Sequence, residues 1–164
     1  MRTLLLAIAA FSMSLAAEAQ TANTHLADVN PFIGTGGEGH TFPGAAAPFG
    51  MVQLSPDTDT TCVIRDCYSH AAGYRYEDSS IMGFSHTHFS GTGHSDMGDV
   101  LMMPVSGEVR LDPGDKDKPG SGYRSRFSHA DEVAEPGYYA VTLKDYDVRA
   151  ELTAGTRIGV QRYT

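Results

Sequence analysis

The alternation of apolar and polar side chains near the C-terminal end of the chain is the feature that most limits its fold. Apolar side chains occupy every second position in 139–143 and again in 148–152, with Lys144 and Asp145 between the two runs. Because side chains alternate between the faces of a strand, this pattern predicts a β-hairpin over 138–153. Tyr139, Val141 and Leu143 would share a face with Val148, Ala150 and Leu152. A further alternating strand is expected within 156–164.

The rest of the chain offers no competing helical pattern. After residue 19, no segment keeps an apolar period of about 3.6 residues over three turns, and glycine and proline separate short apolar runs. Short strands are expected at 51–54, 73–76, 80–84, 100–103 and 107–111. A Ser-Pro-Asp turn is expected at 55–57, and 112–137 is expected to be the least structured part, anchored by Phe127. Together these features predict an all-β fold, an antiparallel β-sandwich.

The N-terminus has the pattern of a secretory signal. Met1 and Arg2 give a basic start, an apolar run covers 4–15, and Ala17-Glu18-Ala19 fits a small-x-small cleavage site. We therefore expect a signal peptide over 1–19, cleaved after Ala19, and one domain over 20–164. The apolar run is too short for a transmembrane anchor. The mature protein is expected in the periplasm or secreted.

Charge and cysteine content narrow the possible partners. The net charge of -8 argues against nucleic acid and anionic membranes as partners. Cys62 and Cys67 are the only cysteines. In an exported protein they could close a small disulfide loop, but the spacing alone leaves this open.

Histidine, aspartate and glycine are concentrated in 85–99, SHTHFSGTGHSDMGD. An extended 81–88 would place His86 and His88 on one face. The three glycines in 91–98 would then allow positive φ angles and return Asp96 and Asp99 toward those imidazoles. Three interpretations compete: a metal site, a sugar-binding surface, and a loop that satisfies its own hydrogen bonds. The residues alone favour the loop, because serine, threonine and aspartate bond neighbouring backbone readily.

The metal interpretation ranks last because no HExxH signature accompanies the HxH. A second polar segment, 29–50, is rich in glycine and proline and is expected to form a looping arm that presents His40 and Thr41. It is not a phosphate loop, since the GxxxxGK[ST] lysine is missing.

Three long segments resemble one known family. VNPFIGTGGEGHTFPGAAAPFGMVQLSPDT, GYRYEDSSIMGFSHTHFSGTGHSDMGDVLMMP and SRFSHADEVAEPGYYAVTL, in this order, are similar to the N-terminal region of glycoside hydrolase family 92, the calcium-dependent exo-acting α-mannosidases. The resemblance implies an N-terminal β-sandwich followed by a larger (α/α)6 barrel. It also implies that the catalytic carboxyl groups and the calcium ligands lie mainly in that barrel. The chain is then a fragment, incomplete at its C-terminus, without catalytic residues or turnover of its own.

The resemblance also implies a set of substrate-binding residues. The Phe49-Gly50 turn would approach the mannose in the cleavage subsite. Relatives that cut α-1,2 links carry a tryptophan before the GY[HR]Y motif. This chain has none, so Tyr68, with His70 behind it, is the expected substitute and the linkage preference stays open. The remaining expected substrate-binding residues are His40, His86, His88, Asp96 and Asp99. Asp96 and Asp99 are too close on one loop to be the two carboxylates of inverting hydrolysis.

The resemblance predicts the N-terminal domain of an exported α-mannosidase that hydrolyses terminal α-linked mannose from N-glycans or mannans. The mechanism would be inverting and assisted by calcium. Partners would be mannose-containing glycans and the downstream catalytic domain of the same polypeptide. A stand-alone carbohydrate-binding domain without catalysis is the alternative. A metal-dependent hydrolase that uses His86, His88, His94 and Asp96 is a third and less favoured hypothesis.

Overall fold

A computed structural model describes residues 25–60, 68–93 and 97–164. The predicted signal peptide with its cleavage site, both cysteines, His94 and Asp96 lie outside these residues. The described part contains strands and three short 3-10 helices, η1 (Leu26–Asp28), η2 (Tyr68–His70) and η3 (His129–Asp131), so the predicted all-β class is confirmed. No helix in it is long and apolar enough to cross a membrane.

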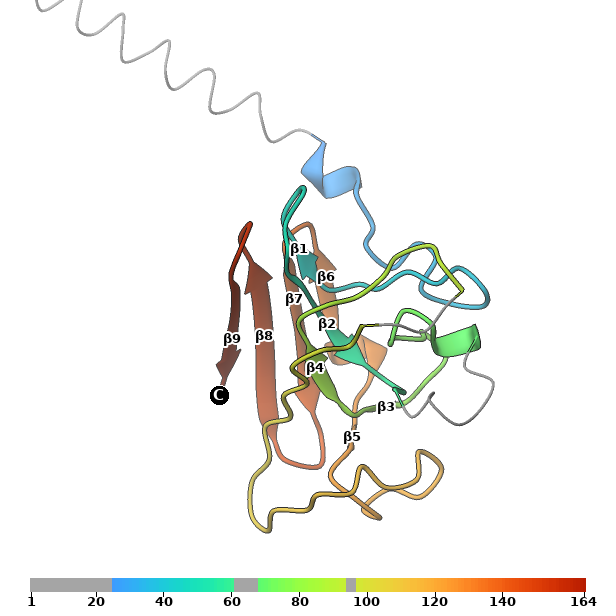
Figure 1. The fold of residues 1–164 in the computed structure, drawn as a ribbon. Helices are drawn as coiled ribbons and strands as arrows, with labels where there is room; N and C mark the ends of the chain where they lie inside the picture. Colours follow the sequence, from blue (N-terminus) through green and yellow to red (C-terminus); the bar gives the residue numbers. More distant parts are fainter. Residues whose placement is uncertain (1–24, 61–67, 94–96) are drawn as a thin grey trace, which may run out of the picture.

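The strands of the described part form three antiparallel sheets (Figure 1). One contains β1 (Ala45–Ala46), β2 (Gln53–Asp57) and β4 (Gly83–Ser85), and a second pairs β3 (Ser80–Ile81) with β5 (Ser125–Arg126). The third has the order β6 (Val133–Glu135), β7 (Tyr138–Leu143), β8 (Val148–Ala154) and β9 (Gly159–Tyr163). The β7–β8 hairpin has the predicted register, with Tyr139 opposite Leu152 and Val141 opposite Ala150.

Two sheets form a sandwich around one apolar core. Leu54 of β2 and Phe84 of β4 are fully buried against the inner face of β7 and β8. That inner face is made of the alternating residues that predicted the hairpin, because one face of each strand is buried. The core contains Leu54, Tyr74, Ile81, Phe84, Phe127, Tyr139, Val141, Leu143, Ala150 and Leu152.

The predicted turn at 55–57 is wrong, because these residues continue β2 and pair with β4. Pro56 lies opposite Phe84 within that pairing. β1 contacts only the Gln53 and Leu54 positions of β2, so the proline lies where the strand has one neighbour. A missing N–H is tolerated there, since no second ladder needs it.

Other expected strands are also corrected. Residues 73–76 form a loop and turn, residues 100–103 contribute only one bridge, between Met102 and Phe84, and 107–111 is exposed and irregular. The 80–84 strand is interrupted at Met82, whose N–H donates to the carbonyl of Asp57. Residues 112–137 are more ordered than predicted, since they contain β5, η3 and β6, with Phe127 buried as the expected anchor.

Candidate functional site

A cavity of about 190 Å³ lies at the end of β2, between the loops that follow β2 and β4. Its wall includes Asp57 and Gly73 together with His70, Thr87 and His88, which belong to segments far apart in the sequence. The complete described lining is Asp57, Asp59, Thr60, His70, Ala71, Ala72, Gly73, Thr87, His88, Met97 and Gly98. Two of the predicted substrate-binding histidines therefore border one cavity.

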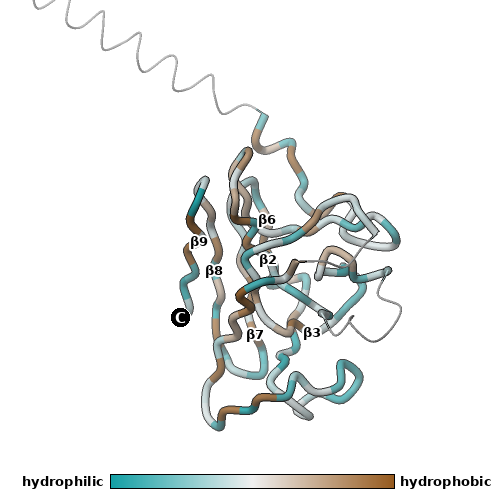
Figure 2. The backbone as a smooth tube through the Cα atoms, in the orientation of Figure 1, coloured by the Kyte–Doolittle hydropathy of each residue, from teal (hydrophilic) through white to brown (hydrophobic). Residues whose placement is uncertain are grey.

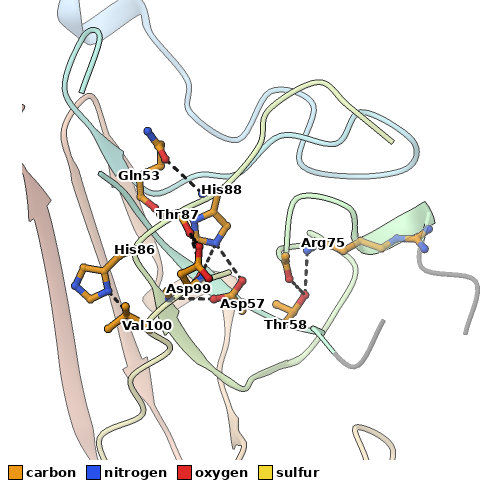
Figure 3. A network of polar contacts seen from close by, with 11 residues as sticks. Gln53, Asp57, Thr58, Arg75, His86, Thr87, His88, Asp99 and Val100 are labelled. Carbon is orange, nitrogen blue, oxygen red and sulfur yellow. Dashed lines mark hydrogen bonds and ion pairs between the residues drawn. The ribbon is translucent and has the colours of Figure 1, made fainter. Parts of the chain in front are cut away.

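A buried ion pair forms one wall of this cavity (Figure 3). His88 Nε2 lies 3.0 Å from Asp57 Oδ1, and the two side chains are only 2% and 1% exposed. The backbone N–H of Ser85 donates to Asp57 Oδ2 at 3.0 Å, so the end of β4 holds the carboxylate. The Ser85 hydroxyl is a further neighbour of His88 Nε2, at 3.0 Å. Strand pairing thus determines where the pair forms.

Both ring nitrogens of His88 face acceptors. Nδ1 lies 2.7 Å from the Gln53 carbonyl oxygen, and Nε2 faces the Asp57 carboxylate. Burial acts to lower the pKa of His88, but the charge and hydrogen bond of Asp57, with the Gln53 carbonyl, outweigh it and raise that pKa. The raised pKa favours the charged form of the imidazole, in which both ring nitrogens are donors.

Gln53 connects this pair to the exposed turn before β2. Its side-chain amide donates to the Gly50 carbonyl at 3.0 Å, and its side-chain oxygen accepts from the backbone N–H of His88 at 3.4 Å. Phe49, beside Gly50, is fully exposed and has a φ of 55°, a conformation that side-chain-bearing residues seldom adopt. One side chain thus joins the Phe49-Gly50 turn to the His88 loop.

Gly73 is required where it approaches Asp57. Its φ is 78°, and a Cβ placed there would lie 2.1 Å from Asp57 Oδ1. The Gly73 carbonyl also accepts from the Thr58 N–H at 2.8 Å, and the Thr58 hydroxyl accepts from the Arg75 N–H at 3.0 Å (Figure 3). A larger residue would move the carboxylate that holds His88.

Tyr68 and His70 are the two ends of η2, and Tyr68 packs against His40 of the 29–50 segment. His70 Nε2 is 2.7 Å from Asp78 Oδ2. Burial acts to raise the pKa of Asp78, but hydrogen bonds from His70 and Thr58 outweigh it and lower that pKa.

The rings of Tyr68 and His40 meet edge to face, with centroids 4.5 Å apart. His40 is buried, and its Nε2, 3.5 Å from a Glu38 oxygen, makes no hydrogen bond within the described residues.

His86 is directed elsewhere, so the expectation that His86 and His88 share a face is wrong. His86 Nδ1 lies 3.0 Å from the Val100 carbonyl, and its Nε2 lies 3.3 Å from the side-chain nitrogen of Gln161 on β9. The alternation fails because β4 ends at Ser85 and the chain turns there. Figure 3 shows the two imidazoles apart.

Asp99 satisfies its own loop rather than approaching an imidazole. The Asp99 carboxylate accepts a hydrogen bond from the Thr87 hydroxyl at 3.1 Å. The backbone N–H of Asp99 donates to the oxygen of that Thr87 hydroxyl at 3.0 Å. Gly91 and Gly98 do adopt the expected positive φ angles. Within the described residues, no group of three histidine, cysteine, aspartate or glutamate side chains could hold a metal ion.

Sequence reasoning missed Gln53, Asp57 and Gly73. The spacing of Gln53 and Asp57 is a usable signal. They are polar residues four positions apart in a buried strand, so their side chains lie on the same face. The local sequence instead favours a turn at Asp57, because Ser-Pro-Asp is a common turn sequence. The predicted residues that do come together are His70 and His88 at the cavity, Tyr68 with His40, and Phe49-Gly50 through Gln53.

Comparison with known proteins gives consistent matches. A family model described as the glycosyl hydrolase family 92 N-terminal domain matches residues 28–164. The solved α-mannosidase BT3965 of Bacteroides thetaiotaomicron, in complex with mannoimidazole, is 52% identical over 85% of this chain, with a TM-score of 0.80. The inverting mannosidase BT2199 of the same organism is 26% identical over 83% of this chain, with a TM-score of 0.59.

A secreted glycosidase of Arthroderma benhamiae, described as uncharacterized, is 35% identical over 127 residues, or 76% of this chain. The chain spans only a small part of each relative: 18% of BT3965, 17% of BT2199 and 15% of the Arthroderma protein.

Proposed function

The chain belongs to glycosyl hydrolase family 92, and on that premise we propose that the whole protein is an α-mannosidase that removes terminal α-linked mannose from N-glycans or mannans. The observation that carries this proposal is the 52% identity to a family 92 α-mannosidase over 85% of the chain. The complete enzyme would be exported, since the first 19 residues have a signal pattern and one relative is described as secreted.

The proposed reaction inverts the anomeric centre. One carboxylic acid protonates the leaving oxygen while a second carboxylate, roughly 6.5–9.5 Å away, activates water on the opposite face of the sugar. Asp57 is unsuited to either role, because its two oxygens are engaged by Ser85 and His88. We assign both catalytic carboxylates to the part of the polypeptide beyond this domain.

The proposed enzyme uses calcium, a hard ion that prefers oxygen ligands and can bind sugar hydroxyls. The described residues do not fit such a site, since no three acidic or histidine side chains gather in them. We therefore place the ligands outside the described part and assign no step of this domain to the ion.

Within this proposal the domain supplies part of the sugar pocket. The exposed Phe49 ring and the Gly50 backbone would contact mannose, and the buried Asp57–His88 pair would hold their turn through Gln53. Tyr68, packed against His40, would contact the leaving sugar. The domain thus positions substrate, and the downstream catalytic domain performs the proton transfers.

The activity is tested with the full-length protein. We expect release of mannose from an aryl α-mannoside and from α-linked mannobiose, with β-mannose as the first product by proton NMR. EDTA should abolish turnover and calcium should restore it. An aryl β-mannoside and an aryl α-glucoside are the controls. Binding of mannosides without any turnover would favour the carbohydrate-binding alternative and contradict the proposal.

The contribution of the domain is tested by Gln53→Leu. Loss of the link to Gly50 should lower kcat/KM about tenfold, as expected for one or two hydrogen bonds that position a contact. The matched control is Gln161→Leu. Gln161 lies on β9 and its side chain contacts His86, and this variant should change kcat/KM less than twofold. Equal losses in both variants would remove the positioning role of Gln53.

Tyr68 is tested by its selectivity between substrates. Tyr68→Ala should reduce cleavage of mannobiose more than cleavage of an aryl mannoside, because only the disaccharide carries a leaving sugar. Equal reductions on both substrates would contradict the assignment of Tyr68 to that sugar.

A further inference from the structure

A second cavity, of about 330 Å³, is lined in part by the β7–β8 turn. In Figure 1 this turn lies at the opposite end of the sandwich from the turn between β1 and β2. The cavity lies among β3, β5, the 112–122 loop and the β7–β8 turn. Figure 2 shows that this loop is largely hydrophilic. The cavity is lined by Ser80, Lys116, Arg124, Arg126, Lys144 and Asp145, among others. Four of these six side chains are cationic, in a chain whose net charge is -8.

Arg124 is the unusual member of this lining. It is only 5% exposed. One terminal nitrogen donates to the Thr58 carbonyl at 3.3 Å and to the Ser80 hydroxyl at 2.9 Å, whereas its buried Nε has no hydrogen-bond partner among the described residues. The ion pairs of the described part include none to Arg124. A buried guanidinium without a counter-charge is costly, so an anion is the expected partner.

The carboxylate that lines this cavity does not fill that role. Asp145 accepts from both the side chain and the backbone N–H of Arg126, so its charge is already paired. Lys144 lies 3.5 Å from Asp131, but both side chains are half exposed, and such pairs contribute little. Lys144 and the exposed Lys116 therefore remain available to a ligand at the rim.

The hydroxyl of Ser80 completes the set of donors. Its oxygen accepts from Arg124, and a hydroxyl that accepts a hydrogen bond still carries one proton that it can donate. Guanidinium, ammonium and hydroxyl donors around one cavity suit a phosphate or sulfate group, which offers several acceptor oxygens. The cavity is larger than one oxyanion, so part of the group that carries the anion would also fit.

We propose that the Arg124 cavity binds a phosphate or sulfate group, either as a free anion or as an ester on a sugar. The site is separate from the proposed mannose pocket, so its occupancy is measurable without reading activity. Arg124 anchors the anion from within, and Lys116 and Lys144 close over it from the rim.

The test is titration calorimetry on the full-length protein at constant ionic strength maintained with chloride. The probes are inorganic phosphate, sulfate and glucose 6-phosphate, with glucose as the neutral control. Because Arg124 is buried and its replacement can unfold the domain, the test variant is Lys116→Ala combined with Lys144→Ala. Lys118→Ala removes a lysine that pairs with Asp115 outside the cavity lining, and it is the matched control.

We expect saturable binding of the oxyanions that weakens about tenfold in the double variant, which loses two charge-assisted contacts, and that is unchanged in Lys118→Ala. Tighter binding of glucose 6-phosphate than of inorganic phosphate would identify an ester on a sugar as the ligand, and equal binding would identify the free anion. Absence of binding above the chloride background, or equal weakening in Lys118→Ala and the double variant, would overturn the proposal.

Discussion

Two buried carboxylates of this domain, Asp57 and Glu132, have similar chemistry in different surroundings. Glu132 accepts from the hydroxyls of Tyr74 at 3.0 Å and Tyr139 at 2.6 Å, and lies 2.6 Å from His129 Nδ1. Both tyrosines belong to the hydrophobic core, where burial and then the charge of Glu132 raise the pKa of each hydroxyl and keep it a donor. Asp57 instead borders a cavity and holds a loop histidine.

The two networks are expected to have different roles: the Glu132 network stabilises the fold, and the Asp57 network also positions residues expected to contact substrate. The Glu132 network joins the loop before β3 to β6 and β7, and it includes no predicted substrate-binding residue. The Asp57 network extends through His88 and Gln53 to Gly50, which is expected to contact substrate. Both networks should contribute to folding, but only the Asp57 network should affect catalysis.

The largest expected effect is that of Asp57→Asn, which removes a charge while keeping the shape. The charged form of His88 would then lose its buried partner, and breaking a buried ion pair costs about 3–5 kcal/mol. Urea unfolding should show this loss, and kcat/KM should fall at least tenfold under folded conditions. Asp117→Asn, on the exposed 112–122 loop, is the control and should change stability by less than about 0.5 kcal/mol. A stable and fully active Asp57→Asn variant would contradict the positioning role.

Gly73→Ala tests the same network from the backbone side. The new Cβ would lie 2.1 Å from Asp57 Oδ1, at a φ of 78°. Strain and displacement together should destabilise the protein by about 2–4 kcal/mol. Gly107→Ala is the matched control: its φ is 85° and nothing lies within 4 Å of the added Cβ, so it should lose about 1 kcal/mol. Equal losses would show that backbone strain alone explains the Gly73 result.

Glu132→Gln gives the other side of the comparison. The amide oxygen can still accept from a tyrosine, but its NH2 group faces donors, so stability should fall by about 1–3 kcal/mol. Because this network does not reach the Gly50 turn, kcat/KM should stay within twofold at temperatures where the variant is folded. A loss of activity like that of Asp57→Asn would remove the distinction between the two networks.

Local patterns predicted the β-hairpin but not the Asp57 network. The register of β7 and β8 followed from alternation within neighbouring segments, and one buried face fixes such a register. The position of the Asp57 side chain depends on hydrogen bonds with Ser85 and His88, which are 28 and 31 residues away. These long-range hydrogen bonds outweigh the local turn preference of Ser-Pro-Asp. The expected position of His86 is wrong for a related reason, since the strand ends at Ser85, three residues before the end of the expected extended segment 81–88.

The predicted site residues divide in the same way. Phe49 and Gly50 could be named because the family resemblance carries them, whereas their support by Gln53 appears only when β2 and the His88 loop are placed together. Their contact with a sugar stays a prediction, as does that of Tyr68. Asp96 lies outside the described residues, so its predicted role is untested.

The smallest expected effect is a pH dependence carried by His88. The folded state raises the pKa of this imidazole above its ordinary value of 6.5, so folding binds a proton more tightly than the unfolded chain does. The resulting stability is fully present below pH 6.5 and declines as the pH rises through the folded pKa. Urea unfolding between pH 6 and pH 9, below the range where tyrosines ionise, should show this decline in the parent protein. His88→Gln should be less stable at pH 6 but show a shallower decline, because the group that binds the extra proton is gone. Parallel pH profiles for the two proteins would mean that the Asp57–His88 pair does not hold its proton preferentially in the folded state.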